Sequence, residues 1–353
     1  MPENNITQPV DAAQAEINEL RARNRAAAQR GVQAGIGRDR FIFNTLVQGN
    51  NAAIMDDQLA RNANNLWVEF TTAVAEEKRM KAEAEVSEKT IWQYFGITPM
   101  REAVAAMKSH PNANIYGIEL EIEGWPMPLE ESSATGFRFT TDGSLRNSGI
   151  EAISLPNSKE GTLKCAKMLW DKYGITEHNF SERTSIHVHA NVLNFTTSHL
   201  QTLMLVYATL EDLLFEFIGQ ERYKNIFCVP WSEAGVSVAR LKSILESPRG
   251  WQKYTALNLA PVRVQGTVEF RHMEGHADIE RLTNWLNIID DIMTFSVNNK
   301  FDDVYKVVSS LNNTSEYSAW AASVLKSSIH IFNSESIRTK LARGVIEAKL
   351  TAI

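Results

Sequence analysis

The stretch YGIELEIEG, residues 116–124, alternates apolar and acidic side chains from Ile118 onward. Successive side chains of an extended chain point to opposite faces, so residues 115–123 are predicted to form a strand with one apolar face. The other face carries three carboxylates, which belong to Glu119, Glu121 and Glu123.

Like charges this close destabilise one another unless a cation or an opposing base lies over them. Carboxylate oxygens gathered on one face suit a hard cation such as Mg²⁺ or Mn²⁺. The alternative is an edge strand whose acidic face is simply solvated. Glu123, at the end of the strand, is expected to be an exposed carboxylate.

A second alternating segment is SIHVHAN, residues 185–191, which places His187 and His189 on one face together with Ser185 and Asn191. Two imidazoles two residues apart can both reach a metal ion or a phosphate. The same pattern also occurs on solvated strands, so this segment alone does not decide between the two interpretations.

The third segment is GTVEFRH, residues 266–272, in which Glu269 and Arg271 share a face with Thr267. His272 falls on the apolar side and is expected to be a core histidine. Glu269 and Arg271 form either a surface ion pair of little energetic worth or a metal-binding carboxylate beside a phosphate-stabilising guanidinium.

The fourth segment is TTDGSLRNSGIEAISLP, residues 140–156, which places Asp142 in a turn and Glu151 on an extended piece. Alone, this pattern is typical of a hairpin with an acidic exposed face. Together, the four segments supply carboxylate, imidazole and guanidinium groups to one polar face of a sheet. The combination favours a cation site over a solvated edge.

Composition restricts the class of protein but does not name its function. The chain has 353 residues, 44% hydrophobic and 22% charged, as in an ordinary globular protein. A net charge of -6 gives no electrostatic reason to expect binding to nucleic acid or to an anionic membrane. Two cysteines, a polar N-terminus and no uninterrupted apolar span indicate a soluble cytoplasmic protein, although a single disulfide is left open.

The order of predicted elements indicates three regions. Residues 1–110 are rich in helix-forming residues and are predicted to be a helical arm or oligomerisation element, in which a helix begins at Ser87 and ends at Gly96. Residues 111–300 mix strands and helices without regular crossover spacing, which favours an α+β domain with a largely antiparallel sheet. Residues 301–353 are predicted to be a helical extension.

Helices are predicted within the mixed region from its apolar periodicity. One runs from Ser158 to Tyr173 and stops at Gly174, and another begins at Ser198 and ends near Ile218. A third covers residues 277–297.

The motifs, taken in order, resemble those of the amidoligases. These are carboxylate–amine ligases with the fold of glutamine synthetase and glutamate–cysteine ligase, found in bacteria and phages. The resemblance extends over residues 115–297 and rests on five segments in the expected order: GIELEIEG, DGSLRNSGIEAISLP, SIHVHANV, KYTALNLAP and GTVEFRHMEG. It implies a curved antiparallel sheet with helices packed on one face and a concave face that binds ATP and divalent cations, Mg²⁺ or Mn²⁺.

The resemblance also implies a reaction, in which the γ-phosphoryl group of ATP passes to a substrate carboxylate and an amine attacks the acyl phosphate. The implied metal ligands are Glu119, Glu121, His187 and Glu269. Among the implied catalytic residues, Asp142 and Glu151 would complete the acidic set or orient the attacking amine, and His189 would lie near the phosphates. Arg271 would hold the γ-phosphate. Lys253, Tyr254 and Asn258 would line the nucleotide or acid pocket.

The substrates expected from this resemblance are a small-molecule or peptide carboxylate and an amine. A non-catalytic structural or assembly protein that retains the ligase fold is the main alternative, because the Ala-rich arm looks like an assembly element that supports a homo-oligomer. A metal-dependent hydrolase or a kinase that phosphorylates a carboxylate would share the same site but would lack the amine acceptor.

Overall fold

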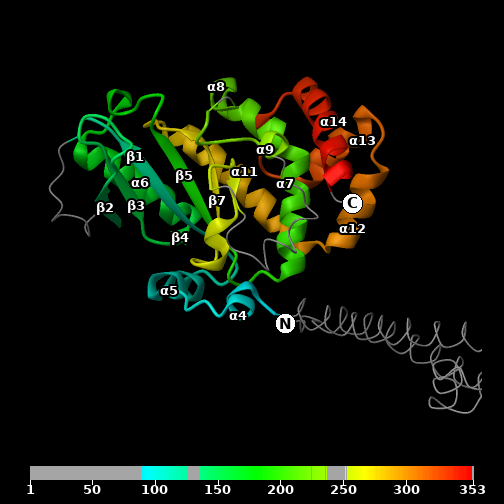
Figure 1. Ribbon diagram of the computed structural model, residues 1–353, viewed down its shortest axis with the longest axis horizontal. Coiled ribbons are helices and arrows are strands. Elements are labelled where there is room, and N and C mark those ends of the chain that lie inside the picture. Colours follow the sequence, from blue (N-terminus) through cyan, green and yellow to red (C-terminus); the bar gives the residue numbers. More distant parts are fainter. Residues whose placement is uncertain are drawn as a thin grey trace, which may run out of the picture. The chain divides into compact units, whose positions relative to one another are not determined.

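The structure is a computed structural model that describes residues 89–125, 136–223, 225–234, 236, 251 and 253–351 (Figure 1). Most of the predicted N-terminal arm, up to position 88, lies outside the described residues, and so does Ser87. No helix within the described ranges combines the length and apolar character needed to cross a membrane.

A seven-stranded sheet forms the centre of the described structure, and every pairing between its named strands is antiparallel. The strands follow the order β2-β3-β1-β5-β7-β6, and β4 pairs separately with β1. This arrangement confirms the predicted α+β class with an antiparallel sheet. The bounds are β1 Ile115–Ile122, β2 Phe137–Thr141, β3 Ile150–Ser154, β4 Asn157–Ser158, β5 Ser185–Asn191, β6 Leu257–Asn258 and β7 Thr267–Glu274.

The apolar residues of the central strands form one face of the sheet and are buried beneath helices. Ile118 and Leu120 of β1 and Val188 of β5 are fully buried in one large hydrophobic cluster. In the β1–β5 pairing, Ile118 lies opposite Val188. The apolar residues of both strands therefore share one face of the sheet, and their polar residues share the other.

Helices α6, α7 and α11 cover the apolar face: α6 packs against β1, α7 packs against β7, and α11 contacts both helices (Figure 1). Helix α6, Lys159–Tyr173, has the predicted ends, with Ser158 as its N-cap and Gly174 at a φ of 62° after its last turn. Helix α7, Thr197–Ile218, begins slightly earlier than predicted. Thr196 is its N-cap in place of Ser198, because the Thr196 hydroxyl accepts a hydrogen bond from the backbone of His199.

Two short helices precede the sheet. Helix α4, Ile91–Phe95, ends at Gly96 as predicted, with a φ of 64° at that glycine. The prediction that this helix begins at Ser87 is wrong: its N-cap is Thr90, whose backbone N–H donates to the side chain of Gln93. The remaining helices are α5 Arg101–Ser109, α8 Gln220–Tyr223, α9 Trp231–Ala234, α11 Ile279–Asn298, α12 Phe301–Ser310, α13 Thr314–Val324 and α14 Ser334–Thr351, with 3₁₀ turns at Glu177–Asn179, Ala260–Arg263 and Ile329–Ile331.

The C-terminal helices belong to the same compact unit as the sheet, which extends over Thr90–Ile353. Helix α14 packs along α7, and α13 packs against α14. Helix α14 lies close to α7 at buried Gly344, where an added Cβ atom would lie 2.2 Å from the backbone oxygen of Thr209. The packing of this helix pair therefore depends on a residue without a side chain.

We expect Gly344→Ala to lower the free energy of unfolding by about 1–3 kcal/mol, because the backbone of α7 cannot move aside as a flexible side chain could. Urea unfolding followed by circular dichroism measures the change. The matched control is Gly143→Ala, where an added Cβ meets nothing within 4 Å and should change stability by no more than about 0.5 kcal/mol. Equal stability of the two variants would contradict the close packing of α14 on α7.

Candidate active site on the polar face of the sheet

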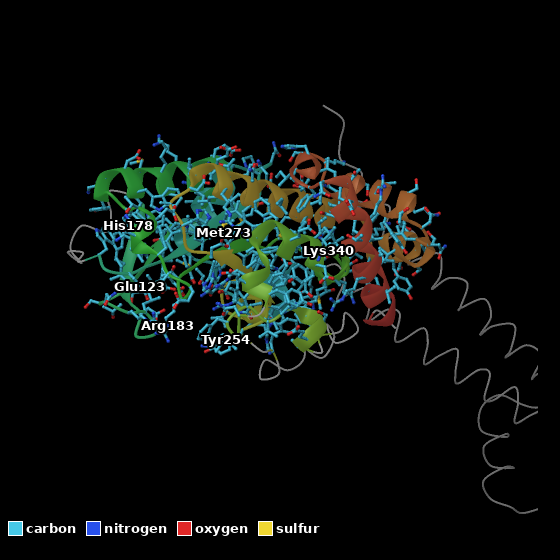
Figure 2. All side chains as sticks on the ribbon, turned by 90° about the horizontal axis from the view of Figure 1, so that it is seen from above. Glu123, His178, Arg183, Tyr254, Met273 and Lys340 are labelled. Carbon is cyan, nitrogen blue, oxygen red and sulfur yellow. The ribbon has the colours of Figure 1, made fainter. Side chains whose placement is uncertain are left out.

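Strand register brings the predicted site residues together on the polar face. Glu119 of β1 lies opposite His187 of β5, and His189 of β5 lies opposite Glu269 of β7. On the other side of β1, Glu121 lies opposite Glu151 of β3. Residues far apart in the sequence thus form one continuous polar surface across four strands. Figure 2 shows that Glu123, Arg183 and Tyr254 lie towards the side of the molecule opposite α6 and α11.

Glu119, His189 and Glu269 are arranged as metal ligands would be. Each offers one ligand atom, and these atoms lie within 4.8 Å of one another. His189 Nε2 is 3.1 Å from Glu119 Oε1, close to the roughly 3 Å that separates neighbouring ligands of an octahedral ion with bonds of about 2.1 Å.

The imidazole of His189 is oriented so that one nitrogen faces the two carboxylates. Its Nδ1 atom contacts the Thr267 hydroxyl at 3.0 Å, whereas its buried Nε2 atom has no aligned hydrogen-bond partner. A hydrogen bond at one ring nitrogen that leaves the other directed at carboxylates is the usual environment of a metal-binding histidine. The orphaned Nε2 atom therefore fits a cation between His189, Glu119 and Glu269.

His187 lies between the same two carboxylates. Its Nδ1 atom is 3.3 Å from both Glu119 Oε2 and Glu269 Oε1, and its Nε2 atom is 2.7 Å from the Ser185 hydroxyl. Ser185 donates its proton to Glu121 at 2.6 Å, so its oxygen accepts from His187 Nε2. That tautomer directs the Nδ1 lone pair at two carboxylates, and such an arrangement requires a proton or a metal ion among the three groups.

The pKa values of Glu119 and His189 show the same demand for positive charge. Burial alone would raise the pKa of Glu119, but the imidazoles of His187 and His189 outweigh it and lower that pKa well below its usual range. Burial would lower the pKa of His189, but the carboxylates of Glu119 and Glu269 outweigh it and raise that pKa. A protonated His189 thus balances part of the negative charge that a cation would balance.

Glu151 is the second group that binds a proton in place of a cation. Burial, followed by the carboxylates of Glu119 and Glu121, raises the pKa of Glu151 to about 8, and Asp142 adds to the effect. Asp142 itself is held in its turn by a hydrogen bond from the backbone N–H of Ser144 at 2.7 Å. Both residues lie at the β2–β3 end of the polar face, as part of its acidic set.

Arg271 and Asn258 hold Glu269 from both sides. The guanidinium of Arg271 is paired with Glu269 Oε1, and the amide of Asn258 donates to Glu269 Oε2 at 2.7 Å. Arg271 also donates from Nε to the carbonyl oxygen of Phe227 at 3.2 Å. Asn258 is 96% buried and contacts Glu269 directly, so its side chain orients this carboxylate.

Lys253 and Arg271 flank the ring of Tyr254. The Lys253 Nζ atom lies 4.7 Å from the ring centroid, and the guanidinium carbon of Arg271 lies 6.0 Å from it. Phe227 packs edge to face against the same ring, with centroids 5.5 Å apart. This end of the polar face is therefore cationic and aromatic, in contrast to the acidic β2–β3 end.

Two expectations about neighbouring residues are decided by burial. The expectation that Glu123 is exposed is wrong: its side chain is 93% buried and accepts a hydrogen bond from the backbone of Arg146 at 2.7 Å. The expectation that His272 is a core histidine is confirmed, because it is fully buried and its Nε2 atom contacts the Tyr207 hydroxyl at 3.0 Å. Burial lowers the pKa of His272 to about 3, so its ring is neutral.

The contacts of Ser185 and Thr267 with the site histidines could not be predicted from the sequence. Ser185 and Thr267 were placed on the polar face by alternation, but their contacts with the histidines depend on register across strands. Glu211 and Arg222 are buried polar residues behind β7, and neither belongs to a recognisable motif.

The raised pKa of Glu151 predicts a pH dependence of stability in the metal-free protein. The folded protein holds this proton up to about pH 8, whereas the unfolded chain releases it near 4.5, so stability falls as the pH rises between these values. In the presence of EDTA, we expect the free energy of unfolding to fall by about 2 kcal/mol from pH 5 to pH 8. This is less than the full pKa shift would give, because Glu151 is partly exposed to solvent.

Urea unfolding at several pH values measures this dependence, and Glu151→Gln should make it smaller. Glu102→Gln, which alters an exposed ion pair with Arg138, is the control and should leave the slope unchanged. A slope that is the same in Glu151→Gln and in the wild type would show that Glu151 is ionised at neutral pH.

Comparison with known proteins finds similarity to a protein family over part of this chain. Residues 160–293 match a family described as "putative amidoligase enzyme". No curated protein matches this chain. A solved structure titled "Crystal structure of novel glutamine synthase homolog" is 11% identical, covers 71% of this chain and 71% of that chain, and has a TM-score of 0.34.

The family match includes β5 and β7, which carry His187, His189, Glu269 and Arg271. Strand β1 and the β2–β3 hairpin precede it. The resemblance indicated by the order of the motifs is thus confirmed, and from residue 160 to residue 293 this chain is similar to the amidoligase family.

Proposed function

We propose that this protein is an ATP-dependent carboxylate–amine ligase whose active site is the polar face of the sheet. The observation that carries the proposal is the pairing of Arg271 with Glu269 beside the ligand atoms of Glu119 and His189. Phosphoryl transfer depends on positive charge placed around the phosphate oxygens, and a guanidinium next to a set of cation ligands supplies it. The similarity to amidoligases over residues 160–293 supports an amide as the product.

The proposed reaction has two steps. A carboxylate oxygen of the first substrate attacks the γ-phosphorus of ATP, which gives an acyl phosphate and releases ADP. The nitrogen of an amine then attacks the acyl carbon, the bond to phosphate breaks, and the amide forms with loss of a proton from nitrogen. The proposed substrates are a small-molecule or peptide carboxylate and an amine.

Glu119, His189 and Glu269 would hold a divalent cation, with His187 and Glu121 beside them. Mg²⁺ or Mn²⁺ supplies, when bound, the positive charge that balances these carboxylates and the phosphate oxygens.

The protein's own groups have distinct parts in this scheme. Arg271 is fixed by Glu269 and by the carbonyl of Phe227, so its guanidinium is oriented before the nucleotide arrives. Lys253, beside the same aromatic ring, extends the cationic surface available to a triphosphate. Glu151 is proposed to accept the proton of the attacking amine once a bound cation has displaced the proton that this carboxyl group otherwise holds.

Activity is tested by incubating the protein with ATP, Mg²⁺ and panels of acids and amines, and by measuring ADP release together with the mass of the products. An amide product is expected. ADP with a phosphorylated acid would indicate a kinase, and ADP with free acid would indicate a hydrolase. No turnover and no nucleotide binding would favour the structural alternative.

Arg271→Lys should lower kcat by about 100- to 1,000-fold, because lysine keeps the charge but loses the fork that contacts both Glu269 and Phe227. Arg138→Lys is the matched control, since Arg138 forms an exposed ion pair with Glu102, and it should change kcat less than about twofold. Steady-state kinetics measures kcat of both variants. Equal activity of Arg271→Lys and the control would contradict the role assigned to Arg271.

Metal binding should release protons, because a cation takes the place of the protons held by His189 and Glu151. We expect release of about one proton or more per Mn²⁺ bound at pH 7. Isothermal titration calorimetry in buffers with different heats of ionisation measures the number.

The Thr267→Val variant tests whether His189 binds the metal ion. It removes the contact at His189 Nδ1 without removing a ligand, and it should weaken Mn²⁺ binding by about 10- to 100-fold. Binding without proton release, or a Thr267→Val variant with wild-type affinity, would argue against His189 as a ligand.

A further inference from the structure

The pairing of β5 with β7 is irregular at the strand positions that form the site. Val188 lies opposite Phe270, but the next aligned pair is Ile186 with Met273. One residue of β5, His187, therefore faces two residues of β7, Arg271 and His272. An extra residue on one strand of an antiparallel pair is a β-bulge, and bulges redirect side chains near functional sites.

This bulge changes which side chains reach the polar face. In a regular strand, Met273 would point to the same side as Glu269 and Arg271, and Glu274 would point into the core. With the bulge, Met273 is fully buried in the core and Glu274 lies opposite Ser185, with its carboxylate paired to Arg281 of α11. The bulge therefore ends the polar stripe of β7 at Arg271 and lets Met273 pack in the core.

Arg222, in α8 behind β7, binds the backbone of the bulge. Its Nε atom donates to the carbonyl oxygen of His272 at 2.8 Å, and its terminal nitrogen donates to the carbonyl oxygen of Arg271 at 2.8 Å. Arg222 is 95% buried. One guanidinium thus satisfies two consecutive carbonyls, which point the same way where a regular strand would direct them to opposite sides.

Strand β6 does not extend far enough to supply these donors. Its pairing with β7 covers Leu257 with Phe270 and Asn258 with Glu269, and the last backbone contact runs from Arg271 N–H to the carbonyl of Ala256. Beyond that contact the carbonyls of the bulge are bound by Arg222.

We infer that Arg222 is a positioning residue of the active site, which holds the β7 bulge and through it the orientation of Arg271 and Glu269. The catalytic effect of Arg222 rests on the proposed function. The binding of the bulge carbonyls by Arg222, which we call the clamp, can be tested independently of that function. Only arginine presents two parallel N–H groups in a rigid plane; lysine offers a single point donor, and alanine leaves two buried carbonyls without partners.

The test compares Arg222→Ala and Arg222→Lys with Arg343→Ala, which changes an arginine near Asp212 on a half-exposed part of the surface. Hydrogen–deuterium exchange is measured for the segment 270–274, for β1 and for α11. We expect at least tenfold faster exchange in segment 270–274 of Arg222→Ala, a smaller rise in Arg222→Lys, and no change in Arg343→Ala or in the other two segments. Ethylguanidinium at millimolar concentration should restore protection in Arg222→Ala alone.

Two functional readouts accompany the exchange experiment. Mn²⁺ affinity should fall about tenfold in Arg222→Ala, and kcat should fall more than KM rises, because Arg271 and Glu269 lose their alignment in the transition state. If the wild-type protein binds no Mn²⁺, the proposed function is contradicted. The exchange data would still show whether Arg222 holds the bulge in place.

Exchange in segment 270–274 that is unchanged in Arg222→Ala would overturn the inference. So would an equal rise in β1, α11 and segment 270–274, since that result indicates only a general loss of stability. If Arg222→Ala does not fold, a rise confined to segment 270–274 in Arg222→Lys supports the clamp, and wild-type exchange in Arg222→Lys overturns it.

Discussion

The repulsion among carboxylates on one sheet face is the constraint on which the rest of the site depends. Glu119, Glu121, Glu151 and Glu269 are brought there by strand pairing, so no side-chain rotation can separate them widely. Without a cation, this constraint raises the proton affinity of His189 and Glu151. A divalent cation would meet it better, because it would add charge and also satisfy oxygen lone pairs that protons leave unused.

The sheet could be predicted largely from the sequence, because alternation over 115–123, 185–191 and 266–272 specifies which residues face the core. Register could not be predicted, since it depends on pairing between residues as distant as Glu119 and His187. The bulge could not be predicted either. The structure alone shows that Met273 points into the core and that Arg222 binds the backbone of the bulge. Glu123 was misjudged for a related reason: the loop that contains Arg146 folds over it and its backbone binds the carboxylate.

The two ends of the polar face suggest a division of roles. The β2–β3 end carries the carboxyl groups of Asp142 and Glu151, whereas Arg271, Lys253 and Tyr254 make the opposite end cationic and aromatic. Between them lie the ligand atoms of Glu119, His189 and Glu269. This arrangement would place a guanidinium and a set of cation ligands around a transferring phosphoryl group, as the proposed reaction needs.

The most direct measurement is anomalous scattering from a crystal soaked with Mn²⁺ and a non-hydrolysable ATP analogue. The account predicts a manganese peak bonded to Glu119, His189 and Glu269, with the terminal phosphate of the analogue within hydrogen-bond reach of Arg271. Manganese bound elsewhere, or an empty space among these three side chains while the nucleotide is bound, would contradict the central claim that the polar face is a cation-dependent phosphoryl-transfer site.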